Sequence, residues 1–331
     1  PAPSIESIYR LIILASREHQ AKLRAEVPLS VNPRTVAVLG GLGGMGRCMA
    51  QLFGDLGHAV MVTDVSTELG NVEAAKAADV VIVSVPIERT VDVIREVGPH
   101  VRPEALLMDV TSIKQEPMAA MMAHTKASVV GTHPMFGPGL HTLQGQRVVV
   151  CPGRGDRWRA WVEQMFGARG LVITRTTPEV HDRMMSIVQV LNHFRTQVMG
   201  LALSRMGVPF EETLAFTSPA YLLEAYVTAR HFAQDPALYG PLEMRNPDVG
   251  RVTETFVDAA SELGSVLSSQ DQAHFAKIFD EVRAFFGDFS GEAEERSQHL
   301  IDRVVELTAG RAPMATDAES EPSTGTGGES P

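Results

Sequence analysis

Three polar stretches of the chain contain residue types that catalyse proton transfer or bind anions. His133 follows an apolar run and precedes a Pro/Gly-rich loop, so its imidazole is predicted to face a cleft at a strand end. A neutral imidazole there can accept a proton from a substrate near neutral pH. Ser112 also follows a strand, and its hydroxyl could hold the imidazole in one tautomer. Arg230 lies in an apolar helical stretch, where a guanidinium is costly unless it meets an anion such as a substrate carboxylate.

Each of these residues also has a purely structural interpretation. The histidine could be a loop residue that is hydrogen-bonded for structure. Ser112 and Lys114, within DVTSIK, could be a helix cap and a solvated charge. Arg230 could form an internal ion pair with Asp235 or Glu224. The sequence leaves these alternatives open.

A cofactor site is predicted in TVAVLGGLGGMG, residues 35–46. Gly41, Gly43 and Gly46 fit G-x-G-x-x-G after an apolar strand and before a helix, which is the arrangement that binds a dinucleotide pyrophosphate. A second apolar run ends in Asp64, whose carboxylate can accept hydrogen bonds from a ribose 2′-hydroxyl and would repel a 2′-phosphate. The pattern therefore favours NAD over NADP. Further cofactor contacts are expected at the helix start and at the next strand end, from Met45, Ser84 and Pro86.

Apolar runs that alternate with helical patterns predict a Rossmann-type doubly wound α/β sheet over residues 34–178. Strands are expected at 35–39, 59–63, 79–84, 105–109, 128–131, 146–151 and 171–174. Residues 179–311 are predicted to form an all-helical domain for substrate binding and dimerisation, with helices at 179–206, 210–233, 248–268 and 270–286.

The two ends of the chain have different patterns. Residues 1–33 contain an amphipathic helix, expected at 4–25, and a linker. Because a single helix cannot bury its own apolar stripe, this one must pack on the body or on another subunit. Residues 312–331 are small, polar and acidic, so we expect a disordered tail.

The composition limits the kinds of partner. A net charge of −11 without a Lys/Arg cluster argues against a nucleic-acid partner. No apolar run approaches the length of a membrane span and no signal-peptide pattern is present, so a cytoplasmic protein with a small-molecule substrate and no membrane association is expected. Cys48 and Cys151 suggest neither a disulfide framework nor a metal site, and no metal is expected.

Seven stretches of the chain together resemble prephenate dehydrogenases. The similarity is greatest to the dehydrogenase part of the form fused to chorismate mutase. In chain order the stretches are GGLGGMG, VSVPI, DVTSIK, GTHPMFGP, HDRMMSIVQVLNHF, SPAY and RHFAQDPALY. The resemblance implies an NAD-dependent oxidative decarboxylation in which a cyclohexadiene ring becomes aromatic. It also implies a homodimer built through the helical domain.

The resemblance assigns roles position by position. His133 matches the catalytic base, and Ser112 matches the serine that orients it. Arg230 matches the arginine that binds a substrate carboxylate, and His193 matches a substrate-pocket histidine linked to tyrosine inhibition. The remaining substrate-binding positions are Lys114 and Gln189.

Two departures from the family pattern bear on the substrate. The N-terminal helix, with Ser16 and Gln20 four residues apart, resembles the last helix of a chorismate mutase. The earlier helices of that enzyme are missing, so we expect a packing remnant without mutase activity. Asn192 stands where the enteric fused enzymes have arginine. These features and an Arg-rich composition favour a branch that acts on 4-amino-4-deoxyprephenate in antibiotic biosynthesis, with prephenate in tyrosine biosynthesis as the alternative. The ring substituent, tyrosine inhibition and the helix's part in the dimer stay open.

Two other classes of protein are weaker alternatives. A non-catalytic NAD-binding sensor would not need His133, Ser112 and Arg230 together. A β-hydroxyacid dehydrogenase would use a lysine base on the first long helix of the second domain, and the stretch from His181 to Met206 contains no lysine.

Overall fold

The computed structural model describes residues 32–140 and 142–308 and, before them, only Ile5, Ile8, Tyr9, Ile12, Ile13, Ser16 and Gln20. These seven early positions have a helical backbone and exposed side chains. The rest of the helix expected at 4–25, its linker and the tail expected at 312–331 lie outside the described residues.

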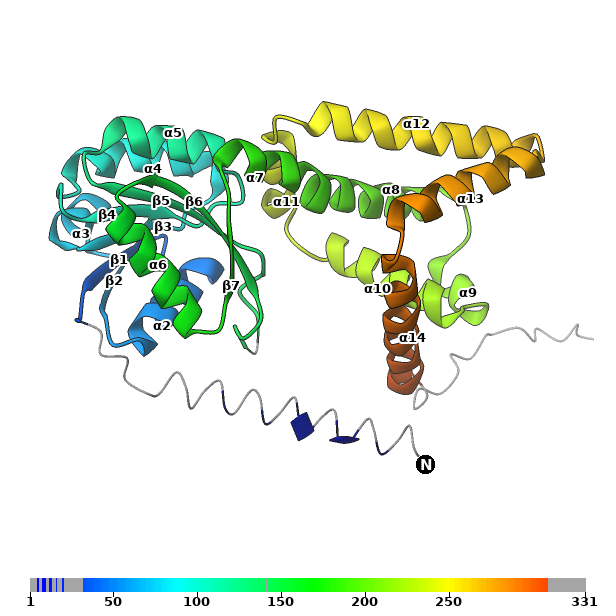
Figure 1. The fold of residues 1–331 in the computed structure, drawn as a ribbon, viewed down its shortest axis with the longest axis horizontal. Helices are drawn as coiled ribbons and strands as arrows, with labels where there is room; N and C mark the ends of the chain where they lie inside the picture. The colour runs from blue at the N-terminus through cyan, green and yellow to red at the C-terminus, as the bar shows by residue number, and fades with distance from the viewer. Residues whose placement is uncertain are drawn as a thin grey trace, which may run out of the picture. The chain divides into compact units, whose positions relative to one another are not determined.

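One seven-stranded sheet organises the first half of the chain (Figure 1). Its order is β2-β1-β3-β4-β5-β6-β7, and all neighbours are parallel except β5 and β6. The strands are β1 (Thr35–Leu39), β2 (Ala59–Thr63), β3 (Val80–Val83), β4 (Leu106–Asp109), β5 (Ser128–Pro134), β6 (Arg147–Arg154) and β7 (Val172–Arg175). All seven predicted strands are confirmed, and so is the Rossmann-type fold. The strand order reverses between β1 and β3, where a doubly wound sheet binds its ligand.

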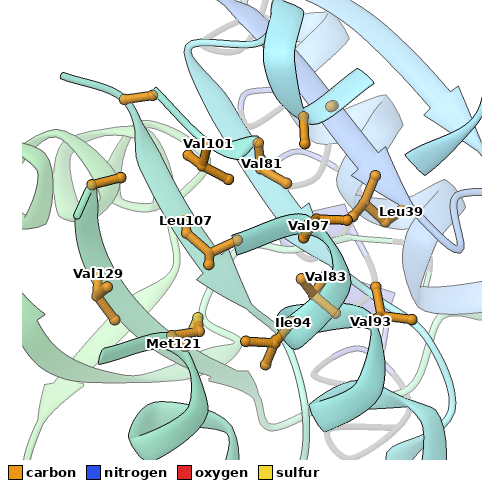
Figure 2. Close-up of a cluster of buried hydrophobic side chains, with 14 of the residues drawn as sticks. Leu39, Val81, Val83, Val93, Ile94, Val97, Val101, Leu107, Met121 and Val129 are labelled. Atoms are coloured by element: carbon orange, nitrogen blue, oxygen red, sulfur yellow. The ribbon is translucent and has the colours of Figure 1, made fainter. Parts of the chain in front are cut away.

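Helices cover both faces of this sheet. The face packed by α3 (Asn71–Ala77), α4 (Ile87–Val97) and α5 (Gln115–His124) contains a continuous buried apolar cluster, part of which Figure 2 shows. The opposite face is covered by α2 (Gly44–Asp55) and α6 (Asp156–Ala168), which bury a second cluster around Phe53 and Phe166. Because the parallel strands are covered on both faces, they are continuous apolar runs rather than alternating ones.

The second half of the chain is helical, as predicted, but it has more helices than the four that were expected. The predicted helix 179–206 comprises α7 (Pro178–Met185), the π-helical turn η2 (Ser186–Leu191) and α8 (Asn192–Arg205). The predicted helix 210–233 is divided into α9 (Phe210–Ala215) and α10 (Pro219–Phe232), because Ser218 caps a new helix that begins at Pro219. The remaining helices are α11 (Pro236–Met244), α12 (Val249–Ser268), α13 (Gln272–Phe286) and α14 (Phe289–Thr308).

The chain divides into two compact units. The sheet unit extends past the predicted boundary at residue 178 to His193 and also includes Asp235–Phe256. The helical unit comprises Phe194–Gln234 and the chain from Val257 onward, and within it α10 packs against α14. The helices α7 and α11 and the turn η2 therefore belong to the same compact unit as the sheet.

Candidate active site

The glycine-rich turn after β1 has the close packing that a dinucleotide cradle requires. A Cβ on Gly46 would lie 2.2 Å from the carbonyl oxygen of Gly40, and a Cβ on Gly41 would lie 2.6 Å from Val62. Gly43 is exposed, and its nearest neighbour to an added Cβ is the Gly40 oxygen at 3.3 Å. Gly41 and Gly46 thus allow the turn and α2 to pack closely, while Gly43 leaves backbone accessible to a phosphate at the α2 N-terminus.

Asp64 lies beside this turn at the end of β2. Its Oδ2 accepts a hydrogen bond from the Leu42 amide at 3.1 Å, and its Oδ1 accepts one from the Val65 amide at 2.8 Å. A carboxylate can accept further bonds at each oxygen, so it fits a ribose diol and repels an additional phosphate. The residues present therefore fit an NAD-type cofactor.

The expected nicotinamide side of the cradle lies at the end of β3. The Ser84 amide donates to the Leu39 carbonyl at 2.8 Å, and a Cβ on Gly40 would lie 2.4 Å from the Ser84 oxygen. Pro86 occupies the position before the first residue of α4, and Met45 packs from the first turn of α2 against the second apolar cluster. The structure therefore places Ser84 beside the glycine-rich turn, at the switch point between β1 and β3, and the cofactor contacts of Ser84, Pro86 and Met45 stay predictions.

His133 is buried near the carboxyl end of β5, opposite Val149 of β6. Its Nδ1 lies 2.9 Å from Nε2 of His181, which belongs to α7. The other nitrogen of His181, Nδ1, lies 2.7 Å from Oδ1 of Asp182. The two imidazole rings meet edge to face, with centroids 5.1 Å apart. His133 is therefore the end of a buried Asp-His-His chain.

Asp182 also binds the beginning of α5. Its Oδ1 accepts a hydrogen bond from the Lys114 amide at 2.8 Å, and its Oδ2 accepts one from the Gln115 amide at 3.0 Å. These amides stand at the positive end of the α5 dipole, which favours the carboxylate form. Although burial alone would raise it, the bonds from His181 and from these amides hold the pKa of Asp182 below its ordinary value. The chain thus begins at an ionised group.

Gln189 faces the free nitrogen of His133 from the π-helical turn η2. Its Nε2 lies 3.4 Å from Nε2 of His133, while its Oε1 is buried and has no hydrogen-bond partner among the described residues. π-helical turns are rare and occur frequently at functional sites. Here the turn places an unpaired acceptor beside the proposed base, as expected for a substrate-binding glutamine.

Burial disfavours the protonated form of both histidines. Burial, then the neighbouring His181 and the charge of Lys114, lowers the pKa of His133 well below its ordinary value. Burial also lowers the pKa of His181, despite its hydrogen bond to Asp182. A neutral His133 can act as a base without first losing a proton.

The structure changes the interpretation of Lys114. Its ammonium is fully buried and paired with the fully buried carboxylate of Asp109. The ammonium is thus paired with Asp109 and is not the solvated charge of the structural alternative, while a direct contact between Lys114 and a substrate stays a prediction. Ser112 lies in the same loop, but Nδ1 of His133 is bonded to His181, so an orienting role for the Ser112 hydroxyl stays a prediction.

The other two expected substrate residues lie elsewhere. His193 ends the sheet unit, where its Nδ1 lies 3.3 Å from Oε1 of Glu243 and its ring meets Tyr239 edge to face. Arg230 is exposed in the last turn of α10 in the helical unit. Of the carboxylates considered as its partners, Glu224 pairs with Arg195 and Asp235 caps α11.

Family models match both halves of the chain. Residues 56–174 match the prephenate dehydrogenase nucleotide-binding domain, and residues 177–281 match the prephenate dehydrogenase dimerization domain. A T-protein of Haemophilus influenzae is 33% identical over 275 residues, covering 83% of this chain and 73% of that protein. The chain belongs to the prephenate dehydrogenase family. The expected family, the class of NAD-dependent oxidoreductase and the cofactor NAD are thereby confirmed.

Other relatives of the chain are named for different substrates. A probable arogenate/prephenate dehydrogenase of Methanocaldococcus jannaschii is 37% identical and covers 83% of this chain, which spans 65% of that relative's length. A 4-amino-4-deoxyprephenate dehydrogenase of Streptomyces pristinaespiralis is 27% identical, covering 78% of this chain and 93% of that protein.

The fold is also that of a solved family structure. The prephenate dehydrogenase of A. aeolicus, in complex with hydroxyphenyl propionate and NAD+, has a TM-score of 0.64 at 17% identity, covering 77% of this chain and 98% of that one. None of the described helices of the present chain is long and apolar enough to span a membrane.

Proposed function

We propose that the protein catalyses the NAD-dependent oxidative decarboxylation of a prephenate-type cyclohexadiene, with His133 as the base that takes the proton from the substituent on ring carbon 4. The observation that carries this proposal is the buried, neutral imidazole of His133. Its Nδ1 is bonded to His181, and among the described residues its Nε2 has a single long contact, 3.4 Å to the amide nitrogen of Gln189. This nitrogen therefore remains available to a substrate at the carboxyl edge of the sheet.

The bond changes of the reaction balance without a further reactant. A bound NAD would supply the acceptor for the hydride that leaves ring carbon 4. His133 takes the proton of the 4-substituent, and the electron pair of the carbon–carboxylate bond enters the ring as CO2 leaves. The protonated His133 then returns the proton to the 4-substituent of the aromatic product. Because aromatisation drives the reaction, the protein mainly needs to orient the ring, remove the proton and exclude water. Arg230 is the proposed ligand of a substrate carboxylate, since a guanidinium binds a carboxylate through two parallel hydrogen bonds.

We further propose an amino group as the ring 4-substituent. Nε2 of His133 and Oε1 of Gln189 are both acceptors, and the glutamine oxygen has no partner among the described residues. A hydroxyl has one hydrogen to donate, whereas an amine has at least two and can satisfy both acceptors.

Prephenate is the second candidate substrate. The names of the more similar relatives favour it, because the 37% identical protein is a probable arogenate/prephenate dehydrogenase. The relative that is named for the amino substrate is only 27% identical.

NADH formation at 340 nm distinguishes the two substrates. Purified protein is assayed with NAD and either prephenate or 4-amino-4-deoxyprephenate. A kcat/KM at least about tenfold higher for the amine, equal to about 1.4 kcal/mol of transition-state preference, supports the amino substrate. The reverse ratio supports prephenate, and no NADH from either compound contradicts the proposed function.

We also propose that the protein is a homodimer. The match to a dimerization domain, residues 177–281, includes a large part of the helical unit, in which the described helices α9 and α13 bury no side chain. It also contains an apolar cavity of about 730 Å³, whose lining includes Leu203, Phe210, Phe216, Tyr221 and Phe232. A second copy would cover such a surface. Light scattering coupled to size exclusion should give twice the mass of the chain, and a monomer at micromolar concentration would contradict the proposal.

A further inference from the structure

We propose that His181 and Asp182 are positioning residues that hold His133 in the tautomer needed for proton removal, an inference that rests on the proposed function. The three side chains form an unbroken chain, with 2.7 Å between Asp182 and His181 and 2.9 Å between His181 and His133. All three residues are at most 2% exposed, so solvent cannot replace these bonds.

The direction of every hydrogen bond in the chain follows from the carboxylate. An ionised carboxylate only accepts, so Nδ1 of His181 must donate to Asp182. A neutral imidazole has one N–H, so Nε2 of His181 has a lone pair and accepts from Nδ1 of His133. His133 is neutral as well, so its own Nε2 has the lone pair. The arrangement therefore places the basic nitrogen of His133 on the side away from His181.

Gln189 supports this direction independently. The group that faces Nε2 of His133 is the amide nitrogen of Gln189, which can only donate. A proton on Nε2 would place two donors against each other. Both neighbours of His133, on opposite sides of its ring, thus favour the same tautomer.

Lys114, Asp109 and Asp182 are the charged groups that act on the two histidines. Lys114 lowers the pKa of both rings, and its pairing with Asp109 offsets that effect only in part, so Asp182 is the group in the chain that favours an imidazolium. When His133 gains a proton from the substrate, its Nδ1–H points at His181, and Asp182 lies directly beyond. The carboxylate therefore stabilises the imidazolium through one intervening ring.

Asp182 also has a structural role. The positioning role can be tested separately by substitutions at His181. Asp182 caps α5, so replacing it would weaken the helix as well as the chain of histidines. His181→Phe keeps a ring of similar size but has no acceptor. His181→Gln places an amide oxygen at about the reach of the lost Nε2, and its carboxamide can accept from His133. His100→Phe, at an exposed position of the sheet unit, is the matched control.

The first measurement is the tautomer of His133 in the ligand-free protein, read from long-range ¹H–¹⁵N spectra at pH 7.5. The resonances of His133 are identified among the 11 histidines by their absence from His133→Asn. We expect a proton on Nδ1 in the wild-type protein and in His181→Gln, and a shift toward Nε2–H in His181→Phe. A wild-type His133 that is protonated on Nε2 overturns the proposal, even if neither His181 variant folds.

The second measurement is steady-state kinetics with the better substrate. His181→Phe should lower kcat about a hundredfold with little change in the KM for NAD, whereas His181→Gln should recover most of the loss. Equal kcat values for His181→Phe and His100→Phe would overturn the positioning role. Failure of the proposed function would be seen in a different result. A fully active His133→Asn would remove His133 from the reaction but would leave the tautomer result unaffected.

Discussion

The ammonium of Lys114 and the carboxylate of Asp109 form an ion pair in which neither side chain is exposed to solvent. A buried pair of this kind gains little over an apolar pair of the same size, but removal of one partner leaves an uncompensated charge in the interior. Asp109 is the last residue of β4, and Lys114 immediately precedes α5. Its main effect is therefore on the stability of the sheet unit.

Lys114→Met should destabilise the sheet unit by about 3–5 kcal/mol, because Asp109 remains charged and buried. Urea unfolding followed by fluorescence gives the change in midpoint. Lys126→Met, at an exposed position of the same unit, should change stability by less than about 0.5 kcal/mol. Combining Lys114→Met with Asp109→Asn should cost less than the sum of the single changes, and additive effects would contradict the ion-pair interpretation.

Gly46→Ala should abolish nucleotide binding, because the added Cβ would lie 2.2 Å from the Gly40 carbonyl oxygen and push α2 away from the turn. Gly54→Ala is the control in the same helix, since its Cβ would meet only Val60, at 3.9 Å. That control should be neutral or stabilise α2 by about 0.5–1 kcal/mol. Isothermal titration with NADH compares the two, and equal affinities would refute the close-packing argument.

Asp64→Ala should reduce the preference for NAD over NADP by about tenfold or more, because it removes both the ribose acceptor and the repulsion of a 2′-phosphate. The ratio of kcat/KM for the two cofactors measures this preference. Asp92→Ala, at a carboxylate exposed on α4, is a suitable control. An unchanged ratio in Asp64→Ala would assign the preference to other residues.

His133→Asn should retain NADH affinity while kcat falls by a factor of about 10²–10⁴, since the base is lost but the cradle after β1 is intact. Stopped-flow and fluorescence titration separate the two quantities. A non-catalytic NAD-binding protein would show no turnover in either form, so the wild-type rate distinguishes that alternative.

Stability should fall as the pH is lowered below about 6.5, the ordinary pKa of a histidine. Burial lowers the pKa of His133 and His181 in the folded protein, so below pH 6.5 the unfolded chain binds more protons than the folded one. Each histidine then removes up to about 1.4 kcal/mol per pH unit. Thermal midpoints between pH 5 and 7.5 should decline less steeply for His133→Asn than for the wild type. Parallel curves would contradict neutral burial of His133.

Much of the sheet could be predicted because its strands are continuous apolar runs, which are typical of parallel strands that are covered on both faces. The cofactor glycines and Asp64 were predictable for a similar reason, since each is fixed by a local turn. The division of 210–233 was missed although Ser218 and Pro219 are a typical helix start, because the apolar spacing continues across them. The turn η2 has no signature that distinguishes it from the α-helices on either side.

The chain of histidines behind His133 could not be predicted from spacing. His181 is 48 residues from His133 in the sequence, and their contact depends on how α7 packs against the sheet. The only indication was the His-Asp pair that opens HDRMMSIVQVLNHF. The burial of Lys114 could not be predicted, because its partner Asp109 lies five residues earlier, across a loop where periodicity says nothing about side-chain direction.

The geometry around His133 depends on the number of residues in the turn η2, which has six. A π-turn holds about one residue more than an α-turn, so a single deletion within Ser186–Leu191 would restore a continuous α-helix. Each residue of an α-helix advances the side-chain direction by about 100°. Such a deletion would rotate Gln189 relative to α7 and therefore relative to His181. The identity of neither side chain would change. The position of Gln189 beside His133 thus depends on the extra residue of the π-helical turn. Substitution of side chains alone would not reproduce this position.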